Sequence, residues 1–343
     1  MKSNIEFLNG RSKALIVAEL SANHGNDLSL ALETVHAFAE AGADAIKVQT
    51  YTPESLCLNV NNEYFGPRKS GLWKGKTSWE IYSEGALPRD WHWKIQEVCI
   101  KHDIEFFSSP FDLDSVDFLN SMGVSRYKIA SMEINDLPLI RKAASQGKPI
   151  IISTGLGEIP DIQRAVDACF EVGNTDITLL KCTSSYPAPF NAANLRTIPD
   201  MAQRFGVSVG VSDHTLGFIV PVASVVLGAS FIEKHVVLNK KLETLDVAFS
   251  LDPTEFAQMV RLVRDAEDTL GDISYVVSDD DKLRRRSLFT NVAFSKGQIV
   301  SEDDLRSVRP AHGADPDSIT RFIGKRAKLY IPAGTPARLD DFE

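Results

Sequence analysis

Two histidines carry the clearest chemical signal in the sequence, because each closes an apolar, strand-like run. His214 follows the run 207–211 in VGVSDHT, and His235 ends the run 231–235 in FIEKH. Neighbouring strands lie about 4.8 Å apart, so imidazoles at adjacent strand ends can reach one ion. Neutral imidazoles suit manganese, iron, cobalt or zinc, with water and substrate oxygens in the other positions. We therefore predict a divalent metal site, beside which Asp213 either orients an imidazole or caps the next helix.

Charged side chains stand in three other apolar runs, near the ends where strands would finish. They are Glu19, Lys47 and Lys128. Burying a charge is unfavourable unless the charge is paired, and barrel enzymes build their sites at the carboxyl ends of the strands. A ring of such charges therefore favours a catalytic site. One pair alone, such as Glu19 with Lys47, would equally fit an internal structural salt bridge.

Hydroxyl side chains follow several of the same runs. They are Ser108, Ser109, Ser131, Ser153, Thr154, Thr183, Ser184, Ser185 and Ser212. Many hydroxyls together with lysines at one barrel mouth suit a phosphate and a carboxylate. The alternative is that these residues cap the helices that follow.

Lys181 gives a different chemical hypothesis. It ends the run 178–181, and a lysine buried at a strand end can form a Schiff base with a carbonyl substrate. A metal-free aldolase is therefore a remote alternative. The adjacent Cys182 has no histidine near it in the sequence and is interpreted as a core residue.

Eight β-branched runs alternate with amphipathic segments, the pattern that positions these residues. The expected strands are 14–19, 45–49, 104–108, 127–130, 150–154, 178–181, 207–211 and 231–235. The expected helices include 28–41, 89–101, 115–122, 137–146, 159–171, 218–227 and 253–270. Eight strand–helix units predict an α/β fold of the (β/α)8 TIM-barrel type. No GxGxxG follows the first strand, which disfavours an open doubly wound sheet.

The chain is expected to divide into a barrel domain at 1–270, a charged linker at 271–286 and a small second domain at 287–343. Within the barrel, the connection 50–88 is unusually long and rich in glycine, lysine and aromatic residues. Long connections at this face of a barrel are usually functional.

Composition excludes several classes of protein. The 343 residues carry a net charge of −9 and no basic stripe, so no nucleic-acid partner is expected. The N-terminal segment lacks the apolar core of a signal peptide, and the most apolar stretch is broken by Pro221 and Gly228, so no membrane span is expected. The four cysteines show no paired spacing, which fits reduced thiols in the cytoplasm.

Longer motifs resemble those of one family. They are IVAELSANHGNDL, AGADAIKVQTYTPESL, FFSSPFD, YKIASMEIND, IISTGL, LLKCTSSYPAP, VGVSDHTLG and FIEKHVVL. Together they resemble the bacterial sialic acid synthase family, most closely its pseudaminic acid branch. The C-terminal motifs SKGQIVSEDDL, SVRP and IGKRAKLYIPAGT resemble the SAF, or antifreeze-like, domain.

This resemblance implies a transferase that condenses phosphoenolpyruvate with the open-chain aldehyde of an N-acetylated sugar and releases phosphate. It implies a (β/α)8 barrel followed by the SAF domain, and a domain-swapped homodimer in which each SAF domain covers the partner's barrel mouth. It also implies a divalent metal, usually manganese, with magnesium or cobalt as alternatives.

Carried over by motif, the resemblance assigns roles to individual residues. His214 and His235 would hold the metal, and Glu133 would handle a proton near the attacking water. Glu19 and Asp246 would contact the sugar, as would Tyr186. The residues around phosphoenolpyruvate would be Lys47, Gln49, Ser109, Lys128, Ser131, Ser153, Ser184 and Ser212. Arg309 of the partner subunit would bind an N-acetyl carbonyl.

The sugar itself is expected to be 2,4-diacetamido-2,4,6-trideoxy-β-L-altropyranose, giving pseudaminic acid, because the long connection resembles that branch. Trp73 and Trp79 would form an apolar wall for the deoxy carbon, or would only pack. The alternatives are N-acetylneuraminate or legionaminate synthesis from another N-acetylated sugar, and, remotely, a non-catalytic sugar- or ice-binding module.

Overall fold

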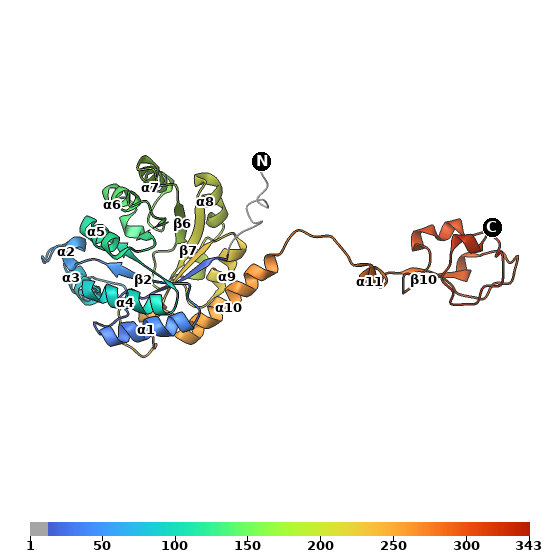
Figure 1. The fold of residues 1–343 in the computed structure, drawn as a ribbon, viewed down its shortest axis with the longest axis horizontal. Helices are drawn as coiled ribbons and strands as arrows, with labels where there is room; N and C mark the ends of the chain where they lie inside the picture. The colour runs from blue at the N-terminus through green and yellow to red at the C-terminus, as the bar shows by residue number, and fades with distance from the viewer. Residues whose placement is uncertain (1–12) are drawn as a thin grey trace. The chain divides into compact units, whose positions relative to one another are not determined.

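Eight parallel strands form a closed barrel in the computed structural model, which describes residues 13–343. They close in chain order, β1 to β8, and β8 pairs back to β1 (Figure 1). The strands are β1 Leu15–Glu19, β2 Ala45–Thr50, β3 Glu105–Pro110, β4 Tyr127–Ile129, β5 Ile150–Ser153, β6 Ile177–Cys182, β7 Ser208–Asp213 and β8 Phe231–His235. The prediction that the N-terminal segment is not a signal peptide concerns mostly residues 1–12, which lie outside the described residues.

Helices cover the outside of this barrel (Figure 1). They are α1 Leu28–Glu40, α4 Arg89–Lys101, α5 Leu113–Met122, α6 Leu137–Ala144, α7 Ile159–Glu171, α8 Thr197–Phe205, α9 Ile219–Val226 and α10 Pro253–Leu270. Two short helices, α2 Pro53–Leu56 and α3 Ser78–Gly85, lie within the long connection between β2 and α4. The strands are buried almost throughout, since helices cover one face and the barrel interior the other.

Aspartates, rather than the serines after the strands, cap four of the barrel helices. Asp27 accepts hydrogen bonds at the start of α1, Asp112 at α5, Asp136 at α6 and Asp252 at α10. Carboxylates suit these positions because they accept from free backbone N–H groups. The interpretation of the strand-end serines as helix caps is therefore wrong for these helices.

Most predicted elements match the observed ones closely. The ranges of β8, α4, α7 and α10 agree at both ends, and the other predicted strands shift by one or two residues. Helix α8 was not among the predicted segments. The long connection, for which no helix was predicted, contains α2 and α3.

The chain divides into two compact units, and the second spans Asp272–Glu343. It includes the predicted linker region, where α11 covers Asp279–Lys282, and a two-stranded antiparallel sheet of β9 Ser287–Thr290 and β10 Leu305–Val308. Its own small core is formed by Leu288, Phe294, Val300, Leu305, Phe322, Ala327, Ile331, Ala337 and Phe342. Within residues 13–343, no helix is both long and apolar enough to cross a membrane.

Candidate active site

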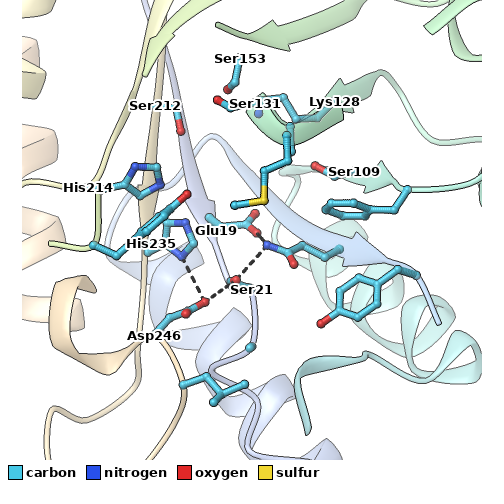
Figure 2. A pocket seen from close by; sticks show the side chains of 18 of the residues that line it. Glu19, Ser21, Ser109, Lys128, Ser131, Ser153, Ser212, His214, His235 and Asp246 are labelled. Carbon is cyan, nitrogen blue, oxygen red and sulfur yellow. Dashed lines mark hydrogen bonds and ion pairs between the residues drawn. The ribbon is translucent and has the colours of Figure 1, made fainter. Parts of the chain in front are cut away.

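A cavity opens at the carboxyl ends of the barrel strands. Side chains from all eight strands or from the residues just after them line it, as do side chains of the long connection 50–88. Figure 2 shows part of this lining, with Glu19, Lys128 and His235 among the labelled residues. We call the charged and hydroxyl-bearing part of its lining the cavity floor, formed by Glu19, Lys47, Ser109, Lys128, Ser131, Ser153, Ser212 and Glu233. The part supplied by the long connection is called the loop wall and is formed by Leu56, Arg68, Trp73, Ile81 and Tyr82.

Lys47 lies at the centre of the buried charges on the floor. Its Nζ is 2.7 Å from Glu19 Oε2 and 3.7 Å from Glu233 Oε1, and it donates to Ser109 Oγ at 3.3 Å. Burial alone would lower the pKa of Lys47, but the two carboxylates together outweigh burial and raise it. Lys47 is therefore cationic. The Glu19–Lys47 salt bridge, which the sequence offered as an alternative to a catalytic site, is present but belongs to a larger network of charges.

Glu233 joins the second lysine to this network. Its Oε2 lies 3.8 Å from Lys128 Nζ, and its Oε1 accepts from Ser212 Oγ at 3.1 Å. Burial would raise the pKa of Glu233, yet Lys128 and Lys47 outweigh burial and lower it. Burial lowers the pKa of Lys128 despite this carboxylate. Glu233 was not assigned a role from the sequence, although it shares a strand face with His235.

Serine hydroxyls meet around Gly155, just after β5. The Gly155 N–H donates to Ser131 Oγ at 3.1 Å, and a Cβ at this glycine would lie 2.5 Å from Ser184 Oγ. Ser153 Oγ is buried without any hydrogen-bond partner. Buried polar atoms are nearly always paired in a complete structure, so this hydroxyl is arranged for a ligand. Ser184 does not itself line the cavity, whereas Ser131 and Ser153 do.

The two predicted metal ligands lie side by side, with their ring planes tilted by 52° to each other. The ring centres of His214 and His235 are 5.1 Å apart. Nδ1 of His214 lies 3.1 Å from the carbonyl oxygen of Thr183, while Nδ1 of His235 is buried without a hydrogen bond, 3.7 Å from Asp246 Oδ2. An unpartnered buried imidazole nitrogen beside a second imidazole fits a divalent metal.

Protein donors alone do not complete a metal site here. Among the residues that the structure describes, no three histidine, cysteine, aspartate or glutamate side chains are grouped to hold an ion. Two imidazoles would therefore leave the remaining positions to water or substrate, as catalytic metals require. A bound metal is still a prediction, and the two imidazoles are compatible with it.

Asp213 binds Lys234 and Thr215 rather than an imidazole. Its Oδ2 lies 2.6 Å from Lys234 Nζ, and its carboxylate accepts from the N–H and the hydroxyl of Thr215. Both Asp213 and Lys234 are buried. The pair fixes the turn that carries His214. The sequence-based predictions for Asp213, as the partner of an imidazole or as a helix cap, are both wrong.

A chain of hydrogen bonds connects the floor to Asp246. Gln49 Nε2 donates to Glu19 Oε1 at 3.1 Å and to Ser21 Oγ at 2.9 Å, and Ser21 donates to Asp246 Oδ2 at 2.6 Å (Figure 2). Ser21 adopts a left-handed backbone with φ of 48°, which is unfavourable for serine. Strained residues of this kind concentrate at functional sites. Ser21 was missed from the sequence, where only its place after the first strand hinted at it.

Glu133 places a carboxyl in the cavity, and one of its two oxygens has no partner. Its Oε2 is buried and makes no hydrogen bond. Burial raises the pKa of Glu133 to about 7, against the opposing pull of Lys128. A carboxyl that titrates near neutrality is suited to accept or donate a proton.

Aromatic rings join the loop wall to the imidazoles. The Tyr186 ring centre is 4.5 Å from that of His214 and 6.3 Å from that of Trp73. Trp73 lines the cavity as predicted, but Trp79 is not among the lining residues. Of the two tryptophans considered, Trp73 is therefore the one that can contact a sugar.

Lys181 points away from this cavity. Strand side chains alternate, and its neighbour Cys182 lines the site while Lys181 lies beside Ala193, Leu195 and Val220 on the helical side. Its Nζ donates to the carbonyl oxygen of Cys182 at 2.8 Å. The Schiff-base hypothesis is therefore wrong. Cys182, interpreted as a core residue, is buried but also lines the cavity, where its Sγ lies 3.9 Å from His214 Nδ1.

Arg309 lies in the second unit, directly after β10, and its side chain is exposed. Its predicted contact with a sugar at a partner's barrel stays a prediction.

Comparison with known proteins identifies the family of this chain. Residues 34–275 match the model of the NeuB family. The chain belongs to the NeuB family. Residues 285–343 match the SAF domain, so the predicted family and the predicted second domain are both confirmed.

Individual relatives cover almost the whole chain. The pseudaminic acid synthase of Helicobacter pylori is 41% identical over 96% of this chain and 97% of its own length. The N,N'-diacetyllegionaminic acid synthase of Legionella pneumophila is 38% identical over 93% of this chain and 92% of its own. The crystal structure of N-acetylneuraminic acid synthetase from Leptospira borgpetersenii, in complex with citrate, superposes with a TM-score of 0.70 at 31% identity, over 79% of this chain and 90% of that one. The barrel fold is thereby confirmed.

Proposed function

We propose that this protein is a pseudaminic acid synthase. It would condense phosphoenolpyruvate with 2,4-diacetamido-2,4,6-trideoxy-β-L-altropyranose, reacting as its open-chain aldehyde, to give pseudaminic acid and phosphate. In this reaction C3 of phosphoenolpyruvate forms a bond to the aldehyde carbon, water adds at C2, and phosphate leaves. The observation that carries the proposal is one cavity that combines a floor of lysines and serine hydroxyls with two neighbouring imidazoles.

The floor supports binding of phosphoenolpyruvate. Lys47 and Lys128 are buried cations, and Ser153 has an unused hydroxyl. Glu233 and Glu19 hold the two ammonium groups in place before the substrate arrives. Charge-assisted hydrogen bonds from such preorganised groups bind phosphate and carboxylate strongly. Ser109, Ser131 and Ser212 add hydroxyls on the same side of the cavity, with Ser184 behind Gly155.

The part of the cavity that runs from Glu19 through Gln49 and Ser21 to Asp246 supports binding of the sugar. Asp246 and Glu19 belong to one hydrogen-bonded chain and offer carboxylate oxygens to sugar hydroxyls. Tyr186 and Trp73 supply aromatic surface against the apolar parts of the sugar.

His214 and His235 would hold a divalent metal, manganese most of all, with magnesium or cobalt as alternatives. When bound, such an ion supplies Lewis-acid polarisation of the aldehyde oxygen. Glu133 titrates near neutral pH and would take the proton of the attacking water.

The assembly is part of the proposal as well. A swapped homodimer in the cytoplasm would bring Arg309 of the partner subunit to the sugar's N-acetyl carbonyl. Arg309 supports this because it is exposed at the end of β10, free to meet a second subunit.

Phosphate release tests the proposal directly. Phosphoenolpyruvate is supplied with each of three sugars at equal concentration: the diacetamido-trideoxy-altrose, the precursor of legionaminic acid and N-acetylmannosamine. We expect the first to give the highest kcat/KM, a loss of activity with chelator and recovery with manganese. Full activity after complete metal removal would refute the metal, and preference for another sugar would reassign the product.

A further inference from the structure

The loop wall contains a cation to which no role has been given. Arg68 lines the cavity, and its guanidinium carbon lies 5.2 Å from the centre of the Trp73 ring. Within residues 13–343, no carboxylate forms an ion pair with Arg68. Its guanidinium instead shares a hydrogen bond with the Tyr82 hydroxyl, whose pKa is raised by burial against the opposing effect of Arg68. A guanidinium carries five N–H donors, so Arg68, which has no carboxylate partner, keeps donors for a ligand in this half-buried wall.

The backbone of the long connection holds this cation in place. The Arg68 N–H donates to the Lys76 carbonyl at 3.0 Å, and the Gly75 N–H donates to the Arg68 carbonyl at 2.9 Å. Trp73 Nε1 donates to the Leu245 carbonyl at 3.2 Å, which fastens this loop to the segment before Asp246. The indole N–H is therefore used within the protein, and the indole offers a ligand only its apolar surface.

The resulting wall has a particular chemistry. Trp73, Leu56 and Ile81 supply apolar surface, while Arg68 supplies charged donors. An acetamido group matches this pattern, because it joins a carbonyl acceptor to a methyl group. A hydroxyl at the same carbon brings no methyl to cover the indole. The anionic groups of phosphoenolpyruvate already have Lys47 and Lys128 on the floor.

We propose that Arg68 and Trp73 form a binding site for the C4 acetamido group of the sugar, with the carbonyl accepting from the guanidinium and the methyl packing on the indole. This inference rests on the proposed function and extends it. It names the residues that distinguish a diacetamido sugar from one with a hydroxyl at C4.

The test compares Arg68→Met and Arg68→Lys with Lys69→Met, an exposed cation next in the chain that does not line the cavity. Two sugars are used, the 2,4-diacetamido sugar and its analogue with a C4 hydroxyl. We expect Arg68→Met to lower kcat/KM for the diacetamido sugar about 10- to 100-fold, as expected for loss of a charge-assisted hydrogen bond. The C4-hydroxyl sugar should change less than about threefold, the KM for phosphoenolpyruvate should stay constant, and Arg68→Lys should recover only part of the loss. Lys69→Met should behave as wild type.

Three results would overturn this assignment. Equal losses for both sugars would give Arg68 a purely structural role in the loop. A raised KM for phosphoenolpyruvate would show that Arg68 binds that substrate instead. An unchanged kcat/KM in Arg68→Met would show that Arg68 does not contact the sugar. Failure of the proposed function is separate, because it appears as absent phosphate release by the wild-type enzyme with the diacetamido sugar.

Discussion

The floor and the loop wall of the cavity are built in different ways. The floor consists of strand residues that are almost fully buried, such as Glu19, Lys47 and Lys128, and their charges are paired with one another. The wall comes from one long connection, and its polar group, Arg68, is half-buried and unpaired with any carboxylate of the described residues. Rigid strands fix groups that must stay in register for bond formation, whereas a loop can vary with the sugar.

Because the two regions differ in this way, we expect their variants to affect activity differently. Floor and imidazole variants should impair the reaction with every sugar, and wall variants should change only the choice of sugar.

The largest effect is expected from removing an imidazole. His214→Ala or His235→Ala should each abolish metal retention and lower kcat at least about 100-fold, since even outer-shell partners of metal ligands contribute 10- to 100-fold. Metal content after gel filtration and phosphate release are the measurements. His312→Ala, in the second unit, is the control. Full metal content in both variants would show that these two histidines do not bind the metal.

Glu133→Gln should lower kcat about 100-fold if this carboxyl accepts the proton of the water. The wild-type rate should then rise as the pH passes about 7, where Glu133 ionises, and the variant should lose this rise. A rate that falls through the same range would make Glu133 an acid instead.

The same substitution has an effect on stability whose sign follows from the raised pKa. In the folded protein Glu133 holds its proton up to pH of about 7, whereas the unfolded chain releases it near 4.5. The protonated carboxyl therefore favours folding at low pH, and this contribution is lost as the pH rises through 7, on the order of 3 kcal/mol in all. Glu133→Gln should gain in melting temperature over wild type at pH 8.5 and not at pH 4.5. Glu97→Gln, an exposed glutamate, should show no such trend.

Lys128→Met should raise the KM for phosphoenolpyruvate about 10- to 100-fold, with equal effects for every sugar, because it removes one charged donor and weakens the hold on Glu233. Steady-state kinetics with each sugar measures this. Lys142→Met, a surface lysine paired with Asp117, serves as the control. A change confined to one sugar would break the division between floor and wall.

The smallest effect is expected at the wall. Trp73→Leu should raise the KM for the sugar about 3- to 10-fold and leave the KM for phosphoenolpyruvate unchanged, because an aromatic surface is lost but no charge. Trp93→Leu, at a partly exposed position on α4 outside the cavity, is the control. A rise in the KM for phosphoenolpyruvate would mean that the wall also supports the floor.

Much of the site was predictable because strand alternation and strand ends are visible in a sequence. Glu19, Lys47, Lys128 and His235 lie in the expected strands and face the cavity together. Glu233 was overlooked in spite of the same signal, because a buried carboxylate two residues before a histidine could equally be a structural partner. The linked groups Ser21 and Asp246 are far apart in the chain, so no local pattern could show their hydrogen bond.

The sequence by itself determined the eight strand–helix units, the family and the residues that end the strands. Hydrophobic period and turn chemistry are local, so they can be read without a structure. Only the tertiary structure decided that Cys182 faces the cavity and Lys181 faces the helices, and that Asp213 binds Lys234 instead of an imidazole. Alternation tells which residues share a face, but barrel closure decides which face turns inward. Closure also brings together charges from opposite sides of the ring, and their mutual pairing then sets the protonation of each.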